Sequence, residues 1–301
     1  MDWTQSALSI NPQQIEHEII SFIKDHFNSL NRKVAILGLS GGLDSSVMAA
    51  LVAKSLEKDQ VKLYYLPERD SKSTHRRHAI FLAEKLEANL TIIKITPALR
   101  ALNIYRLLPL SYFPGQKLKA QAVSFGKKQL LSRSNGEFLS TRLSASGGSW
   151  VARGNAYVSA KHRLRMVALY KEAERMRGMV IGAANKTEWM TGTFTQWGCD
   201  QCADLMPILH LYRSQLIPLA KHLELPDEII TKKADPDVLP GFDDKGELLG
   251  SFREADLILW GLENQISQND LQNRFGSEKV AYIQTLVKNS AYYRESPYSL
   301  L

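Results

Sequence analysis

The sequence lacks several features that would assign it to a class at once. No apolar run reaches the roughly 18 residues that a membrane-spanning helix needs, and the first residues show no signal-peptide pattern. The two cysteines, Cys199 and Cys202, provide no disulfide framework and are typical of a protein of the reducing cytoplasm. No long basic run accompanies the net charge of +7, so the charge does not favour nucleic acid over a small polyanionic ligand.

Two common phosphate-binding motifs are absent as well. There is no GxxxxGK[ST] loop, and Gly38, Gly41 and Gly42 do not have the GxGxxG spacing. Instead, SGGLDSS at 40–46 joins an apolar run to a helical pattern. A glycine turn between a strand and a helix leaves backbone N–H groups that bind anions, with help from the helix dipole. Asp44 would repel a phosphate unless Mg²⁺ lay between them, so the segment predicts a phosphate and magnesium site.

The hydrophobic pattern predicts an α/β protein with a single doubly wound parallel sheet and flanking helices. Strands and helices alternate along the chain, which is typical of a sheet covered on both faces. We expect a single domain over 1–301, with an irregular insertion at about 100–155. The expected strands are 33–39, 61–67, 90–95 and 179–183. The expected helices are 12–30, 74–86, 156–177, 205–225, 251–263 and 277–293.

Several stretches together resemble a known family. SGGLDSS after a strand resembles the pyrophosphate loop of the ATP pyrophosphatases, which split ATP into AMP and pyrophosphate. Residues 179–198, MVIGAANKTEWMTGTFTQWG, resemble the ammonia-dependent NAD synthetases of that superfamily, as do DLMPI, LYRSQ and ELLG further on. The resemblance covers about four fifths of the chain, leaves out 100–155, and implies a fold like that of the adenine nucleotide alpha hydrolases.

The resemblance implies a reaction in two steps. The nicotinate carboxylate of deamido-NAD attacks the α-phosphorus of ATP and pyrophosphate leaves; ammonia then attacks the adenylated carboxyl group, giving NAD and AMP. Adenylation is needed because a carboxylate is a poor electrophile with a poor leaving group. Positioning and charge neutralisation carry most of the rate of such a reaction. The implied partners are therefore deamido-NAD, ATP, ammonia and a second copy of the chain, with Mg²⁺ as cofactor.

Residue roles follow from the same resemblance. Asp44 and Glu188 would be catalytic and would bind Mg²⁺ from two strand ends. The implied ATP contacts are Gly38, Leu39, Ser40, Gly41, Gly42, Leu43, Asp44, Ser45, Ala183, Arg213 and Asp235. The implied deamido-NAD contacts are Arg163, Gln196, Asp204, Lys232, Tyr292 and Tyr293.

Some of these positions depart from the family pattern. Ala183 and Asp235 stand where the family has hydroxyl side chains, and Gln196 replaces a lysine. Tyr292 and Tyr293 replace a His-Lys pair. These changes put individual contacts in question more than the reaction, and they indicate a divergent branch.

Two other functions remain open from the sequence. A tRNA-thiolating or other adenylating ATP pyrophosphatase would share the loop and use cysteines, and Cys199 and Cys202 form a C-x-x-C pair. Packing or coincidence is the simpler explanation of the pair. A non-catalytic nucleotide-binding protein would also keep the loop, but it would not need both Asp44 and Glu188.

Overall fold

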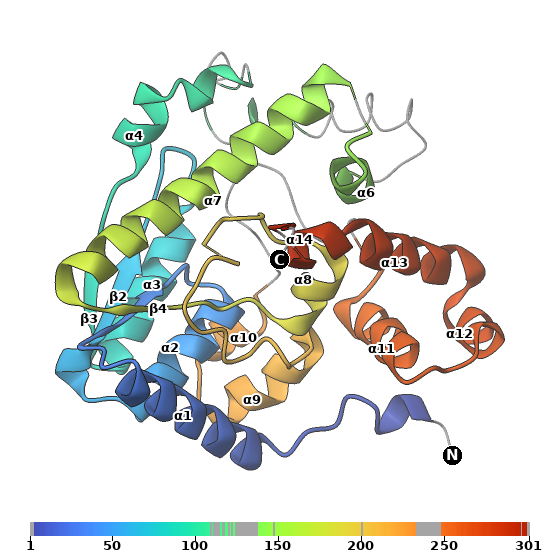
Figure 1. Cartoon of the computed structure of the whole chain (residues 1–301), viewed down its shortest axis with the longest axis horizontal. Helices are drawn as coiled ribbons and strands as arrows, with labels where there is room; N and C mark the ends of the chain where they lie inside the picture. The colour runs from blue at the N-terminus through green and yellow to red at the C-terminus, as the bar shows by residue number, and fades with distance from the viewer. Residues whose placement is uncertain are drawn as a thin grey trace.

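Four parallel strands form one sheet in the order β3-β2-β1-β4, as expected for a doubly wound α/β protein (Figure 1). The computed structural model describes residues 3–108, 110, 115, 118–119, 121, 123, 138–146, 148–199, 201–232, 248–295 and 297–299. The strands are β1 (Ala35–Gly38), β2 (Val61–Tyr65), β3 (Asn89–Ile92) and β4 (Met179–Ile181). Both neighbours of β1 run parallel to it, so the carboxyl ends of β2, β1 and β4 meet at one edge.

Successive residues of the strands face two separate hydrophobic cores. Ala35 and Leu37 of β1 point into one core, whereas Ile36 points into the other together with Tyr64 and Val180. This alternation follows from the period of two in a strand, and burial on both faces explains the nearly continuous apolar runs.

Helices from both halves of the chain cover the first face. In α1 (Pro12–Ser29), Ile19, Ile23 and Phe27 are buried at helical spacing, and the Asn11 side chain caps the first turn. The same face carries α2 (Leu43–Ser55), α3 (Ser73–Lys85), α9 (Leu216–His222) and α10 (Asp227–Ile230).

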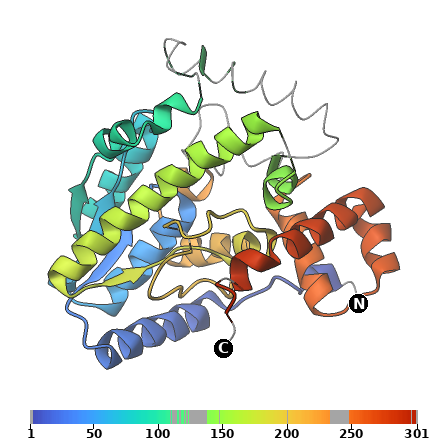
Figure 2. The ribbon, with the colours of Figure 1, turned by 45° about the horizontal axis from the view of Figure 1, so that its top comes forward.

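A long helix, α7 (Ser149–Met176), crosses the second face of the sheet (Figures 1 and 2). Its Leu169 and Ala173 pack with Ile36 and Val180 of the strands. The second core also takes in residues of α4 (Thr96–Ala101) and the 3₁₀ turn η3 (Ile104–Arg106).

A third core lies among the C-terminal helices, beside the sheet (Figure 1). Trp3, in the turn η1 (Trp3–Gln5), stacks on Trp260 with ring centroids 5.3 Å apart, so the beginning of the chain is anchored there. The elements of this region are α6 (Phe138–Leu143), α11 (Phe252–Glu263), α12 (Gln268–Phe275), α13 (Ser277–Asn289) and α14 (Ala291–Glu295).

The structure corrects several expected helices. The helix expected at 205–225 was wrong for its first half: that stretch is turns followed by η5 (Arg213–Gln215), and only α9 is helical. Leu205 instead forms an isolated parallel bridge with Ile181. The helix α7 begins seven residues before position 156, α12 was missed, and a break at Ser290 separates α13 from α14. The remaining short elements are η2 (Lys58–Gln60) and α8 (Lys186–Thr191).

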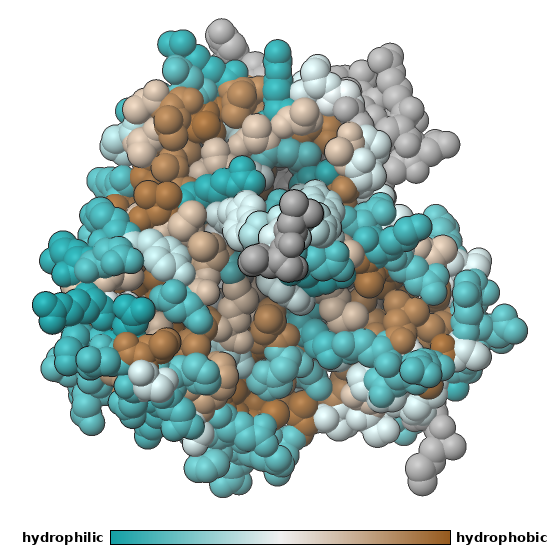
Figure 3. All heavy atoms as spheres, viewed as in Figure 1, coloured by the Kyte–Doolittle hydropathy of each residue, from teal (hydrophilic) through white to brown (hydrophobic). Residues whose placement is uncertain are grey.

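Hydrophobic and hydrophilic residues are interspersed over the face that Figure 3 shows. Among the described residues, no helix is both long and apolar enough to cross a bilayer.

Candidate functional site

The loop between β1 and α2 is shaped by Gly41, whose φ of +74° is in the left-handed region. A Cβ at this position would lie 2.4 Å from the His75 carbonyl oxygen, so any side chain would push the loop away from α3. The Ser40 and Ser45 hydroxyls lie 2.9 Å apart, and the Gly42 carbonyl accepts from Ser45 and Ser46. These bonds hold the loop closed at the start of α2, the geometry that an anion-binding loop needs.

The two predicted metal carboxylates lie on the same side of the molecule, with Asn185 between them. The Asn185 side-chain amide donates to Asp44 Oδ1 at 3.0 Å. The same residue forms a capping box with Glu188: its side chain accepts from Glu188 N at 3.0 Å, and its backbone N–H donates to Glu188 Oε2 at 3.1 Å. Through one residue, therefore, the start of α8 is tied to the start of α2.

Arg213 completes this group from η5. Its Nε lies 3.5 Å from Asp44 Oδ1, and the side chain is only 10% exposed. Its backbone N–H donates to the Thr187 hydroxyl at 2.8 Å, and that hydroxyl donates to Asp256 at 2.5 Å. Burial raises the pKa of Asp256, although donors from Ser214 and Thr187 favour its ionised form. This buried network fixes the backbone from which Arg213 reaches Asp44.

Lys232 lies behind residues 40–46, the predicted phosphate loop. Its ammonium group donates to the Gly41 carbonyl at 2.9 Å and lies 2.9 Å from His75 Nδ1. Burial, together with the charge of Lys232, lowers the pKa of the neighbouring His78. This direction favours a neutral His78 beside the ammonium group of Lys232. The family resemblance implies a dinucleotide contact for Lys232, and in the structure its ammonium group is bonded to the loop between β1 and α2.

Two of the predicted dinucleotide contacts, Arg163 on α7 and Gln196 in the segment after α8, lie in contact. Arg163 donates from Nε and Nη2 to the Gln196 carbonyl, at 3.2 and 3.1 Å. Next to this pair, Trp189 stacks on Phe194 with centroids 5.1 Å apart, and Tyr293 packs edge-on against Phe194. In this contact with Arg163, Gln196 uses its backbone carbonyl rather than its side chain.

The tail residues Tyr292 and Tyr293 lie together on α14, with ring centroids 4.4 Å apart. The Tyr293 carbonyl accepts from the Gln201 side chain at 2.7 Å, which ties the tail to the segment after α8. The tail thus reaches the region around Arg163 and Gln196.

Asp204 is exposed, but both of its carboxylate oxygens are bonded to the fold. Its Oδ2 accepts from Val180 N of β4 at 2.8 Å, and its Oδ1 accepts from the Tyr170 hydroxyl of α7 at 3.1 Å. Ala183 follows β4 and is half-buried. Asp235 lies outside the described residues.

The carboxylates of Asp44 and Glu188 suit a magnesium ion whose remaining ligands come from a bound phosphate. The carboxylates of Asp44 and Glu188 provide hard oxygen atoms, and Mg²⁺ characteristically uses one or two carboxylates together with substrate phosphates. Among the described residues, there is no group of three or more His, Cys, Asp or Glu that could hold a metal unaided. The residues therefore fit a metal that arrives with a phosphate chain.

Sequence reasoning assigned no role to Asn185, Thr187 or Asp256. Asn185 had a readable signal, because N-x-x-E before a helix is a capping-box pattern. Asp256 gave none: it lies within an amphipathic helix, and only the structure shows it to be fully buried against Ser214 and Thr187.

The fold and the loop together define a class of protein. A parallel α/β sheet carries a Gly-Gly loop at the amino end of a helix, at the sheet edge where such folds bind nucleotides. The family is then shown by comparison: a model described as NAD synthase matches residues 15–109 and 137–297, and the chain belongs to this family. The unmatched residues 110–136 fall within the expected insertion.

Named relatives agree with this assignment. The chain is 36% identical over 284 residues to the NH(3)-dependent NAD(+) synthetase of Thermotoga maritima, covering 93% of this chain and 96% of that protein. It is 30% identical over 284 residues to the enzyme of the same name from Coprothermobacter proteolyticus, covering 94% and 96%.

Solved structures of low identity support the fold. The NH3-dependent NAD synthetase from Campylobacter jejuni aligns with a TM-score of 0.69 at 23% identity, covering 97% of this chain and all of that chain. The NMN synthetase from Francisella tularensis aligns with a TM-score of 0.70 at 23% identity, covering 97% and 99%.

Proposed function

We propose that this protein catalyses the ATP-dependent amidation of deamido-NAD by ammonia, forming NAD, AMP and pyrophosphate. Membership of the NAD synthase family supports the reaction. The observation in the structure that carries it is the bridge from Asp44 through Asn185 to Glu188, which places two carboxylates beside the phosphate loop. A nucleotide-binding protein without chemistry has no need for that pair.

The first step requires charge to be managed around the ATP phosphates. Backbone N–H groups at the start of α2 and the guanidinium of Arg213 bind the phosphate oxygens, and the ammonium of Lys232 polarises the loop from behind. Asp44 and Glu188 would hold Mg²⁺, which, when bound, neutralises charge on the pyrophosphate leaving group. The remaining ATP contacts come from residues 38–45.

The second substrate binds where the segment after α8 meets α7. Arg163, held against Gln196, presents a cation for the phosphates of deamido-NAD, and the rings of Trp189, Phe194 and Tyr293 offer apolar faces beside it. The nicotinate carboxylate is then positioned for attack on the α-phosphorus, and the protein contributes mainly orientation and exclusion of water. We further propose that two copies of the chain associate.

The function is tested by supplying purified protein with deamido-NAD, ATP, Mg²⁺ and ammonium chloride, and following NAD, AMP and pyrophosphate in equal amounts. Pyrophosphate without AMP, or no NAD, would contradict the proposal. Nicotinate mononucleotide serves as a competing substrate, and a clear preference for deamido-NAD is expected. Glutamine in place of ammonium tests the nitrogen source, and light scattering of the same sample measures the oligomeric state.

A further inference from the structure

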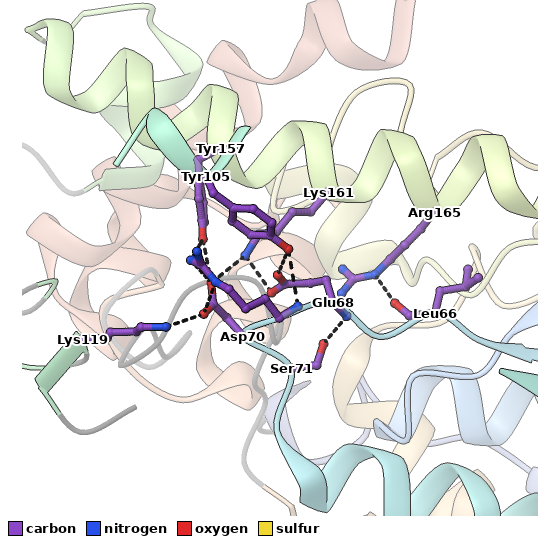
Figure 4. Close-up of polar contacts among 10 residues, drawn as sticks. Leu66, Glu68, Asp70, Ser71, Tyr105, Lys119, Tyr157, Lys161 and Arg165 are labelled. Carbon is purple, nitrogen blue, oxygen red and sulfur yellow. Dashed lines mark hydrogen bonds and ion pairs between the residues drawn. The ribbon is translucent and has the colours of Figure 1, made fainter. Parts of the chain in front are cut away.

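A buried cluster of charges joins the loop after β2 to α7, outside the residues assigned above (Figure 4). Its members are Glu68, Arg69, Asp70, Lys119 and Lys161, with the hydroxyls of Tyr105 and Tyr157. The side chains of Glu68 and Lys161 are 0% exposed and that of Asp70 is 1% exposed. Burying the charges of Glu68, Asp70 and Lys161 so completely is costly, and such charges persist only where their partners are well placed.

The contacts run from one stripe of α7 to both carboxylates of the loop. Tyr157, Lys161 and Arg165 are spaced four residues apart, so they share one face of the helix. Lys161 donates to Glu68 Oε1 at 2.8 Å, and Tyr157 donates to Asp70 Oδ2 at 2.7 Å. Arg165 donates to the Leu66 carbonyl at 3.2 Å (Figure 4).

Glu68 and Arg69 make further hydrogen bonds that hold this loop. Tyr105 donates to Glu68 Oε2 at 2.7 Å, and the Glu68 backbone N–H donates to the Ser71 hydroxyl at 3.1 Å. Arg69 makes two bonds to Asp70, at 3.1 and 2.8 Å, and its guanidinium lies 3.9 Å from the centre of the Tyr105 ring. The path of residues 66–71 is therefore fixed by side chains from α7 and η3.

Residues 66–71 lead directly into α3, and the first turn of α3 packs against the phosphate loop. The His75 carbonyl is the atom that a Cβ at Gly41 would strike, and His75 Nδ1 shares the Lys232 ammonium with the Gly41 carbonyl. From the other side, Leu39 N donates to the Tyr64 carbonyl at 2.8 Å. Displacement of residues 66–71 would therefore shift the support of the phosphate loop.

We propose that Lys161 is a positioning residue for the ATP phosphate loop, acting through Glu68 and the first turn of α3. This inference rests on the proposed use of ATP. The contacts of Lys161 to Glu68 and Asp70 lead to the loop before α3, so we expect its substitution to affect ATP more than deamido-NAD. Burial lowers the pKa of Lys161 and the Glu68 carboxylate opposes that shift, as expected for a cation held by its partner.

The charges of the cluster determine which variants test the proposal. Lys161→Met leaves the Glu68 carboxylate buried without its cation, whereas Asp70 keeps Arg69 and Lys119. Glu68→Gln/Lys161→Met removes one charge of each sign and restores the balance. Lys171→Met is the matched control, since Lys171 lies on the same helix, pairs with Glu172 and is 64% exposed.

The experiment is a calorimetric titration with Mg²⁺ and α,β-methylene-ATP, an analogue that cannot release pyrophosphate. The KM of each substrate is measured in parallel. For Lys161→Met we expect the Kd of the analogue and the KM of ATP to rise about tenfold or more, because small misplacements of a binding loop are expensive. The KM of deamido-NAD should stay within about twofold, and the double variant should return the analogue Kd to within about threefold of wild type. Lys171→Met should match wild type.

Three results would overturn the proposal: an unchanged analogue Kd in Lys161→Met, an equal loss for both substrates, or no rescue by the double variant. If Lys161→Met does not fold, Tyr157→Phe removes one donor from Asp70 without changing charge, and a rise of about threefold in the analogue Kd is expected; no rise would count against the proposal. Wild-type protein that binds the analogue but makes no NAD would contradict the proposed function and leave this test intact.

Discussion

Two polar clusters lie at neighbouring strand ends and use their carboxylates differently. After β1 and β4, Asp44 is 24% exposed and shares its contacts with Asn185 and Arg213. After β2, Glu68 and Asp70 are buried and are matched by cations of the protein itself. The first arrangement leaves negative charge for a cation that comes with a ligand, and the second leaves none.

We infer from this difference that the first cluster is suited to binding a metal and that the second holds the framework. A carboxylate that is to bind a metal must stay accessible and incompletely neutralised, whereas a buried carboxylate is stable only when its hydrogen bonds are filled. Substitutions in the first cluster should therefore reduce turnover with little loss of stability. Substitutions in the second should reduce stability, or the affinity for one substrate.

The largest effect is expected at Asp44. Asp44→Asn keeps the shape of the side chain but removes a charge that would hold Mg²⁺, so NAD formation should fall about a thousandfold. Glu188→Gln should behave alike, and the melting temperature of each should change little. Steady-state assays of NAD and pyrophosphate measure the loss. Glu87→Gln, at an exposed ion pair with Lys58, is the control, and an Asp44→Asn enzyme with near-normal turnover would remove the distinction between the clusters.

The opposite behaviour is expected of Asp70. Asp70→Asn leaves Arg69, Lys119 and Lys161 facing a neutral group in a dry site, so we expect a loss of about 3 kcal/mol in the free energy of unfolding. Urea titration measures it. A loss below about 0.5 kcal/mol, the size of a surface effect, would show that the cluster is not structural.

Asp70 should also affect how the stability of the protein depends on pH. Burial alone would raise the pKa of Asp70, but hydrogen bonds from Arg69, Tyr157 and Lys119 hold it well below its usual range. Below about pH 4 the unfolded chain then takes up a proton that the folded chain does not, so this stabilisation is lost as the pH falls. Asp70→Asn should flatten the decline of stability from pH 4 downward. An unaltered slope would mean that other carboxylates set the acid limit.

A smaller effect is expected at Lys232, which lies at the back of the phosphate loop. Lys232→Met removes the donor to the Gly41 carbonyl, so the KM of ATP should rise about tenfold while that of deamido-NAD changes less. Initial rates at varied concentrations of each substrate separate the two. Lys221→Met in α9 is the control. A larger effect on deamido-NAD would favour the dinucleotide role that the sequence indicated.

Most of the fold was readable from the sequence because the strands are buried on both faces and carry short apolar runs between helical patterns. The proximity of Asp44 and Glu188 was also readable, since both follow strands of one parallel sheet. The contacts of Lys232 were not readable, because its partners are a backbone carbonyl and a histidine far away in the sequence. Lys161 falls in a strongly basic helix that resembles a solvated face, and only packing shows that it is buried.

The smallest effect is expected at the C-x-x-C pair. Cys199 Sγ lies 3.4 Å from His162 Nδ1, and burial raises the pKa of the Cys202 thiol, which disfavours a reactive thiolate there. Replacing both with serine should change kcat and each KM by no more than about twofold, because neither thiol has a role in adenylation or amidation. Assays of the double variant in the presence of reductant measure this. Loss of activity in the double variant, with its melting temperature preserved, would instead favour sulfur chemistry on this fold.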